Sequence, residues 1–193
     1  MARKSTRDII IGVAAGLFAT IGLRRTTMEI IATAAGRGRR TIYMYFSNKS
    51  EIYEAVVDSE ITRITKSLKD VTASENSFKL LLRNYTKERI KALSDLADRN
   101  PLLIKDFALG LSRVEKLRER LLSEELKILT PLFRRHVQEL NLAGGTTPDD
   151  YALIFLNMLR GSDRLLTREN GHAKDKHLSL AAADLFIKGL GCR

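Results

Sequence analysis

The sequence predicts an all-α fold in which three short helices near the N-terminus precede a larger helical bundle. Apolar residues recur at three- and four-residue spacing along most of the chain, as on one face of an amphipathic helix. No stretch has the sustained apolar and polar alternation of a half-buried strand. The helical segments are separated by "TASENS", "RNP", "LNLAGGTTPDD" and "RENGHAKD", which are rich in Gly, Pro and small polar residues.

The first helix is predicted over residues 7–21, with Gly22 as its C-terminal stop. Its inward face is predicted to consist of Ile10, Val13, Ala14, Leu17, Phe18 and Ile21. The basic start followed by the apolar run 9–19 imitates a secretory signal. That run is shorter than the ~20 apolar residues of a bilayer span, and Asp8 precedes it. We therefore expect a folded helix rather than a targeting segment.

The second helix is predicted to begin at Thr26 or Thr27, because Thr26 and Glu29 have the spacing of a capping box. Gly36 then marks a tight turn, and a third helix is predicted over 38–44. The inward face of the second helix is predicted to consist of Ile30, Ile31, Ala34 and Ala35.

Longer helices are predicted for the rest of the chain, after an N-cap at Ser47 or Asn48. Pro131 is expected to kink or divide the helix that contains it, because proline lacks the backbone N–H. The predicted ranges are 48–71, 76–98, 102–109, 112–142, 148–169 and 175–190.

Positive charge is concentrated at the start of the chain. The net charge is +10 over 193 residues, of which residues 1–50 carry +7 and the remaining residues +3. A basic surface attracts polyanions, which for a chain of this kind means nucleic acid or an anionic membrane face. The sequence therefore predicts a basic head and a nearly neutral body.

Few residues favour catalysis, metal binding or disulfide formation. No nucleophile and base pair, paired carboxylates or phosphate-binding glycine loop is recognisable, so we expect no enzyme and no cofactor. His172 and His177 flank Asp175 without a recognised ligand spacing, and no metal site is expected. The single cysteine, Cys192, has no intrachain partner, which is typical of a protein in the reducing cytoplasm.

The stretch "GRGRRTIYMYFSNK", residues 36–49, concentrates basic and aromatic residues on the third helix. Two short helices joined by a glycine-containing turn have the layout of a helix-turn-helix, whose second helix enters the DNA major groove. Arginine reaches guanine or phosphate there, and threonine and tyrosine hydroxyls reach backbone oxygens. The alternative is an ordinary solvated face, and the stretch alone leaves both interpretations open.

The flanking residues favour DNA binding, because the run from Ile9 to Val56 resembles the DNA-binding head of the TetR family of bacterial transcriptional regulators. The resemblance covers about 45 residues and rests on an ordered set of matches. They are Ile10, Ala14, Leu17, Phe18, Gly22, Thr27, Ile31, Ala32, Ala35, Gly36, Thr41, Ile42, Tyr43, Tyr45, Phe46, Asn48 and Lys49.

This resemblance implies a role for each residue of the predicted DNA-binding site. Thr27, Tyr43 and Lys49 are expected to contact phosphates, and Ile42 and Phe46 to belong to the core that seats the helix. The residues expected to face the groove are Arg39, Arg40, Thr41, Met44 and Tyr45.

The turn before the third helix departs from the family pattern. The usual Gly-Val-Ser is Gly36-Arg37-Gly38 here, which replaces a packing valine by arginine and a capping serine by glycine. Arg37 either adds a phosphate contact or the turn is looser.

The resemblance also implies a second domain for dimerisation and ligand binding. We expect a DNA-binding domain over 1–50 and a helical domain over 51–193 that forms a homodimer through its last two helices. Leu178, Ala182, Leu185 and Gly189 are predicted at the dimer interface, with ordinary core packing as the alternative. Phe107, Phe133, Phe155 and Met158 are predicted to line a pocket for an unknown small-molecule effector, although aromatic residues at helical spacing usually form core.

Three polar residues of the next-to-last helix carry two interpretations. Asn157, Arg160 and Asp163 lie in an apolar neighbourhood and are candidates for recognising a polar group of the effector. Alternatively, Arg160 and Asp163 form an ion pair three residues apart along one helix.

The sequence thus predicts a dimeric, ligand-responsive repressor that binds double-stranded operator DNA and releases it when a small molecule binds. One rival is a helical enzyme or metabolite-binding scaffold with an incidental basic head. The other is an architectural protein that binds DNA without sequence preference.

Overall fold

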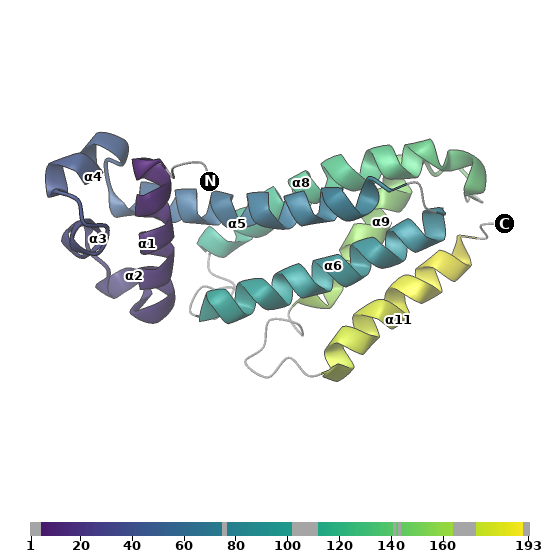
Figure 1. The fold of residues 1–193 in the computed structure, drawn as a ribbon. Coiled ribbons are helices and arrows are strands. Elements are labelled where there is room, and N and C mark those ends of the chain that lie inside the picture. Colours follow the sequence, from purple (N-terminus) through teal and green to yellow (C-terminus); the bar gives the residue numbers. More distant parts are fainter. Residues whose placement is uncertain are drawn as a thin grey trace.

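A computed structural model describes residues 5–74, 77–101, 112–140, 142, 144–163 and 173–190. All regular structure among these residues is helical, which confirms the predicted fold class. Figure 1 shows α1 to α4 gathered at one end of the molecule and the longer helices extending away from them. Within the described residues, no helix is both long and apolar enough to cross a membrane.

The head begins with α1, Thr6–Thr20, close to its predicted range. Ser5 caps it, because its hydroxyl accepts from the Asp8 amide at 3.1 Å and the Asp8 carboxylate accepts from the Ser5 amide at 3.3 Å. A short helix α2, Gly22–Arg25, was not predicted; Gly22 has φ +81°, so the residue expected to stop the first helix instead starts another turn.

Helices α3, Met28–Ala34, and α4, Arg39–Tyr45, match the predicted second and third helices. The predicted inward face of α3 is partly wrong. Ile30 is 37% exposed, whereas Met28, Ile31 and Ala32 are buried. The helix is only seven residues long, so a small rotation of its axis exchanges one apolar position for the next.

Helix α5, Lys49–Thr72, runs from the head into the body. It has 24 residues and is about 36 Å long. Asn48 caps it through its side-chain oxygen, which accepts from the Glu51 amide at 3.0 Å. Ile52, Ala55 and Val56 pack into the apolar cluster of the head. From Val57 onward the buried apolar residues of α5 belong to the cluster of the body.

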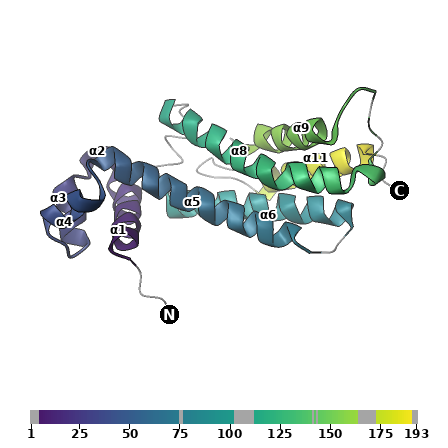
Figure 2. The same ribbon diagram turned by 90° about the horizontal axis from the view of Figure 1, so that it is seen from above.

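The body contains α6, Phe78–Arg99, α8, Ser112–Arg135, α9, Pro148–Gly161, and α11, Ala173–Gly189, with a short 3-10 turn at Val137–Glu139. Figure 2 shows α8 and α9 along one side of the body and α5 and α6 along the other. α11 packs against α6 and α9.

Some predicted boundaries differ from those observed. The helix predicted over 112–142 ends at Arg135, four residues after Pro131, and is not divided at the proline. The helix predicted over 148–169 ends at Gly161. The segment predicted over 102–109 lies outside the described residues.

A buried ionic network joins three parts of the body. Arg89 on α6 donates to Glu125 on α8 at 2.6 Å and to Asp163, just after α9, at 2.6 Å. Tyr85 donates to Glu125 at 2.8 Å. Burial alone lowers the pKa of Arg89, but the two carboxylates reverse this effect and raise the pKa above its ordinary value. Of the two alternatives for Arg160 and Asp163, the ion pair between them is not formed, since Asp163 pairs across the fold with Arg89.

Candidate nucleic-acid interface

Helix α4 lies at the end of the head that is farthest from the body (Figure 1). Its N-cap is Gly38, whose extended backbone places its carbonyl to accept from the amides of Thr41 at 2.9 Å and Ile42 at 3.3 Å. No side chain caps this end, as the replacement of the usual serine by glycine implies.

Two apolar side chains hold α4 on the head. Ile42 is fully buried and Phe46, one turn later, is 4% exposed, so both belong to the core as predicted. The guanidinium of Arg7 on α1 lies 5.3 Å from the centre of the Phe46 ring. These contacts fix the rotation of α4 about its axis and so decide which residues face outward.

The outward face of α4 consists of large basic and amphipathic side chains. Met44 is 77% exposed, and Tyr43 and Tyr45 are 43% and 44% exposed. Arg39 and Arg40 are exposed and Thr41 is half-buried. Exposing three large apolar or aromatic side chains on a seven-residue helix is unfavourable in water, which indicates a surface that another molecule covers.

The turn between α3 and α4 depends on Gly36, which has φ +60°, a conformation that residues with a side chain rarely adopt. The Arg37 amide donates to the Ala32 carbonyl at 3.0 Å and closes the turn. The Arg37 side chain is exposed, and its guanidinium donates to the Gly36 carbonyl at 3.1 Å. The turn is therefore held by backbone hydrogen bonds, without the packing valine of the family pattern.

Thr27 and Glu29 form the start of α3. Thr27 is the N-cap, and its hydroxyl oxygen accepts from the Ile30 amide at 3.2 Å. The predicted capping box between Thr26 and Glu29 is not formed; the Glu29 carboxylate instead pairs with the Arg39 guanidinium at 2.8 Å. A hydrogen bond from a backbone amide, followed by the charge of Arg39 and a smaller effect of the Thr27 hydroxyl, lowers the pKa of Glu29.

Lys49, predicted to contact phosphate, has structural partners in the free protein. Its ammonium donates to the carbonyls of Leu23 at 2.7 Å and Thr26 at 2.8 Å. These two carbonyls lie at the end of α2, where helix carbonyls lack partners within the helix. Lys49 thus ties the first residue of α5 to the segment that leads into α3, and its contact with phosphate stays a prediction.

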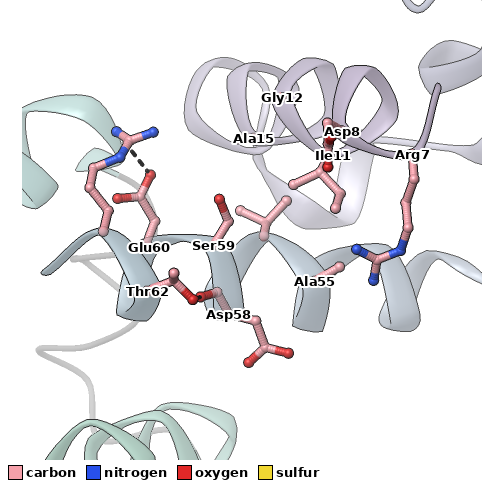
Figure 3. A pocket seen from close by; sticks show the side chains of 12 residues that line it. Arg7, Asp8, Ile11, Gly12, Ala15, Ala55, Asp58, Ser59, Glu60 and Thr62 are labelled. Carbon is pink, nitrogen blue, oxygen red and sulfur yellow. Dashed lines mark hydrogen bonds and ion pairs between the residues drawn. The ribbon is translucent and has the colours of Figure 1, made fainter. Parts of the chain in front are cut away.

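A cavity of about 540 Å³ lies where α1 meets α5 (Figure 3). Ile11, Gly12 and Ala15 line it from α1, and Ala55, Ser59 and Thr62 are among its α5 residues. The charged groups at its rim already have partners: Glu60 pairs with Arg63 at 3.7 Å and with Arg99 at 2.9 Å, and Asp58 pairs with Arg120. The cavity is distinct from the predicted effector pocket.

The residues predicted to line the effector pocket lie in the body core. Phe133 and Phe155 are fully buried, and their ring centres are 6.0 Å apart within an aromatic cluster that also includes Tyr85 and Phe186. Met158 is half-buried against the same core, and Phe107 lies outside the described residues. Their role as a ligand pocket stays a prediction.

The residues predicted at the dimer interface lie on the outer side of α11. Leu178 and Leu185 are 47% and 70% exposed. Gly189 is exposed and Ala182 is half-buried. On α9, which packs against α11, Leu153 and Ile154 are 41% and 51% exposed. The last two described helices therefore carry large apolar side chains that the single chain leaves uncovered.

The family model described as "Bacterial regulatory proteins, tetR family" matches residues 10–56, which include α2 to α4 and most of α1. The segment that contains the helix-turn-helix thus matches the TetR family. The model describes bacterial regulatory proteins, and the relatives below are described as transcriptional regulators.

Curated relatives match only part of this chain. It is 34% identical over 90 residues to the HTH-type transcriptional regulator TtgR of Pseudomonas putida, covering 44% of this chain and 43% of TtgR. It is 43% identical over 56 residues to the probable regulator ArpR of Pseudomonas putida, covering 29% of this chain and 27% of ArpR. The matches thus span about half or less of the relatives' length.

Solved structures extend the likeness to nearly the whole chain. A transcriptional regulator from Cytophaga hutchinsonii has a TM-score of 0.76 at 23% identity, covering 95% of this chain and 97% of that one. SmeT, the repressor of the Stenotrophomonas maltophilia efflux pump SmeDEF, has a TM-score of 0.70 at 20% identity, with coverages of 96% and 90%. At these identities the likeness establishes the TetR-type fold alone.

Proposed function

We propose that this protein is a dimeric transcriptional regulator that binds a palindromic operator through α4 and releases it when a small molecule binds the body. The main support for this proposal is the outward face of α4, where Arg39, Arg40 and Met44 are exposed beside two half-exposed tyrosines. The match of the head to the TetR family model supports DNA as the partner.

The chemistry of this face suits the major groove. Arginine matches the O6 and N7 acceptors of guanine, and a methionine or threonine methyl contacts the thymine methyl. We assign base contacts to Arg39, Arg40, Thr41, Met44 and Tyr45, and phosphate contacts to Thr27, Arg37, Tyr43 and Lys49.

Two copies of the head are needed for tight binding, because one seven-residue helix contacts only a short stretch of DNA. Of the ten large hydrophobic side chains that are exposed among the described residues, Leu153, Ile154, Leu178 and Leu185 lie on α9 and α11. Joining this surface to its copy buries apolar area in both chains. We assign the interface to these helices, including Ala182 and Gly189.

The response to an effector is assigned to α5. This helix contributes buried residues to the head and to the body, so a ligand that displaces it in the body also moves α4. One solved neighbour, the regulator FadR from Bacillus subtilis, is a complex with stearoyl-CoA, and SmeT represses an efflux pump. Both are below 25% identical to this chain, so neither ligand class is transferred to it.

Selection of bound DNA from a random-sequence library tests the proposal. We expect a palindromic motif whose half-sites are separated by about one helical turn, or 10–10.5 base pairs, and an affinity at least ~10³-fold above that for random DNA at equal salt. A ratio near one would support the architectural alternative.

The same experiment with Leu185→Glu tests the dimer. A buried unpaired charge opposes association, so we expect a monomer in sedimentation that keeps its helical circular dichroism and loses tight operator binding. Leu80→Glu is the control, because Leu80 is 42% exposed on α6, outside the assigned interface. An intact Leu185→Glu dimer at micromolar concentration rules out this interface, and a monomer that still binds tightly rules out the symmetric mechanism.

A further inference from the structure

An ion pair lies on the surface assigned to DNA. Glu29 in the first turn of α3 accepts from Arg39, the first residue of α4, with 2.8 Å between the carboxylate oxygen and the guanidinium nitrogen. Both side chains are more than half exposed, at 55% and 63%. Among the described residues 5–50, no other ion pair is formed. A carboxylate at this position is unexpected, since it opposes the approach of phosphates.

The carboxylate restricts the conformation of Arg39. The guanidinium carbon of Arg39 lies 5.6 Å from the centre of the Tyr43 ring, one turn along α4. A hydrogen bond to Tyr43, followed by the charge of Glu29, raises the pKa of Arg39. The guanidinium is thus held from two sides before any partner arrives. An arginine loses much rotational freedom when it binds, and ordering it beforehand lowers that cost.

The position of Glu29 in the sequence leaves its carboxylate available for this contact. The residue that would close a capping box with Thr27 is three positions later, at Ile30, which has no polar side chain. Glu29 therefore does not occupy the capping-box position of α3. Its carboxylate reaches across the turn to the first residue of the next helix.

We propose that Glu29 is a specificity-determining residue, which positions Arg39 for a bidentate contact with guanine and disfavours DNA that lacks this base. Guanine accepts two hydrogen bonds from one guanidinium in the major groove. When the matching guanine is present, Arg39 offsets the repulsion between Glu29 and the phosphates. When it is absent, the repulsion remains and binding weakens. This role rests on the proposed DNA-binding function.

The test compares the DNA motifs selected by the wild-type protein, Glu29→Gln, Arg39→Ala and the double variant. Glutamine keeps the length of the side chain and removes its charge. We expect Arg39→Ala to abolish a guanine preference at one position of each half-site. We expect Glu29→Gln to reduce the preference at the same position by about tenfold, within the range of one bidentate contact. The double variant should match Arg39→Ala.

Binding to random DNA provides a second readout and a control. Glu29→Gln should bind random DNA several-fold more tightly at low salt, because a charge that repels phosphate has been removed. Asp70→Asn removes an equal charge from the exposed surface of α5 at the end distant from the head, and should leave both readouts unchanged.

Three results would overturn parts of this account, and each is distinguishable. If the wild-type protein selects no motif, the proposed function itself fails. If it selects a motif and Glu29→Gln keeps the full guanine preference, only the role of Glu29 fails. If Glu29→Gln changes a different position from Arg39→Ala, Glu29 reads a base such as cytosine directly and does not position Arg39.

Discussion

The head and the body use arginine in opposite ways. In the body, Arg83, Arg99 and Arg134 pair with Asp184, Glu60 and Asp149 at 2.5–2.9 Å, and Arg89 is fully enclosed with its carboxylates. In the head, Arg24, Arg25 and Arg40 have no ion-pair partner among the described residues. Carboxylates therefore neutralise these arginines of the body, whereas these three arginines of the head have no carboxylate beside them. Net charge alone therefore does not locate a binding surface.

The two regions also differ in how much apolar surface they bury. Among the described residues, the body cluster contains 24 buried apolar residues and the head cluster 13, three of which come from α5. Small cores provide little stabilisation, so we expect the head to depend strongly on individual polar contacts. The following variants test this contrast, from the largest expected effect to the smallest.

Arg89→Met tests whether the body depends on its buried ions. The change leaves Glu125, which is 1% exposed, without its cation. Removing one partner of a buried pair costs about 3–5 kcal/mol of unfolding free energy, which denaturant unfolding measures. Arg83→Met is the control, because the exposed pair of Arg83 and Asp184 should contribute about 0–1 kcal/mol. Equal small losses in both variants would mean that packing, and not charge pairing, stabilises this part of the body.

Lys49→Met tests the contribution of one polar contact to the head. Two carbonyls lose their charged donor, and such hydrogen bonds are worth about 1.5–3 kcal/mol. We expect this substitution to accelerate amide hydrogen exchange in α1 to α4 more than in the body, relative to the wild-type protein. Lys66→Met, at an exposed position of the same helix, is the control. If exchange in the head is unchanged, the carbonyl contacts are not stabilising.

The same Lys49 variant tests the predicted phosphate contact. The slope of log affinity against log salt should become shallower by about 0.9 if one phosphate contact is lost. An unchanged slope together with a destabilised head would limit Lys49 to its structural role.

Gly12→Ala should give the smallest effect and should stabilise the head. A methyl group at Gly12 meets no atom within 4 Å, and alanine is favoured over glycine in a helix interior by up to about 1 kcal/mol. Thermal unfolding measures the gain. Gly36→Ala is the control and should be destabilising, because Gly36 has φ +60°. A loss of stability in Gly12→Ala would indicate that α1 needs flexibility or a close approach at this position.

Most of the helices and the outward face of α4 were predictable from the sequence, because their signals are local. Thr27, Asn48 and Thr147 act as N-caps within the segment that they begin. Ile42 and Phe46 are four residues apart on an otherwise polar and aromatic helix, so their burial follows from helical spacing. Ile30 shows the limit of this reasoning, since apolar spacing on a helix of two turns does not fix which residue faces inward.

A signal for the buried network was also present in the sequence. Arg89 continues the apolar face of Leu81, Leu82 and Tyr85 on α6 at helical spacing, and Glu125 occupies the corresponding face of α8 with Leu121 and Leu129. Charged residues of opposite sign on two apolar faces are typical of a buried pair. Which charges meet could not be read from the spacing, because Arg89 and Glu125 are 36 residues apart and Arg89 and Asp163 are 74 apart.

By itself, then, the sequence determined most of the helices, the basic head and the residues that α4 turns outward, since each depends on neighbours within about one or two turns. Tertiary structure decided the partners of Glu29, Lys49 and Arg89. It also decided that Phe133 and Phe155 pack against aromatic neighbours. The physical reason is that the energy of a charge or an aromatic ring depends on the atoms packed around it, and those atoms come from segments that only the fold brings together.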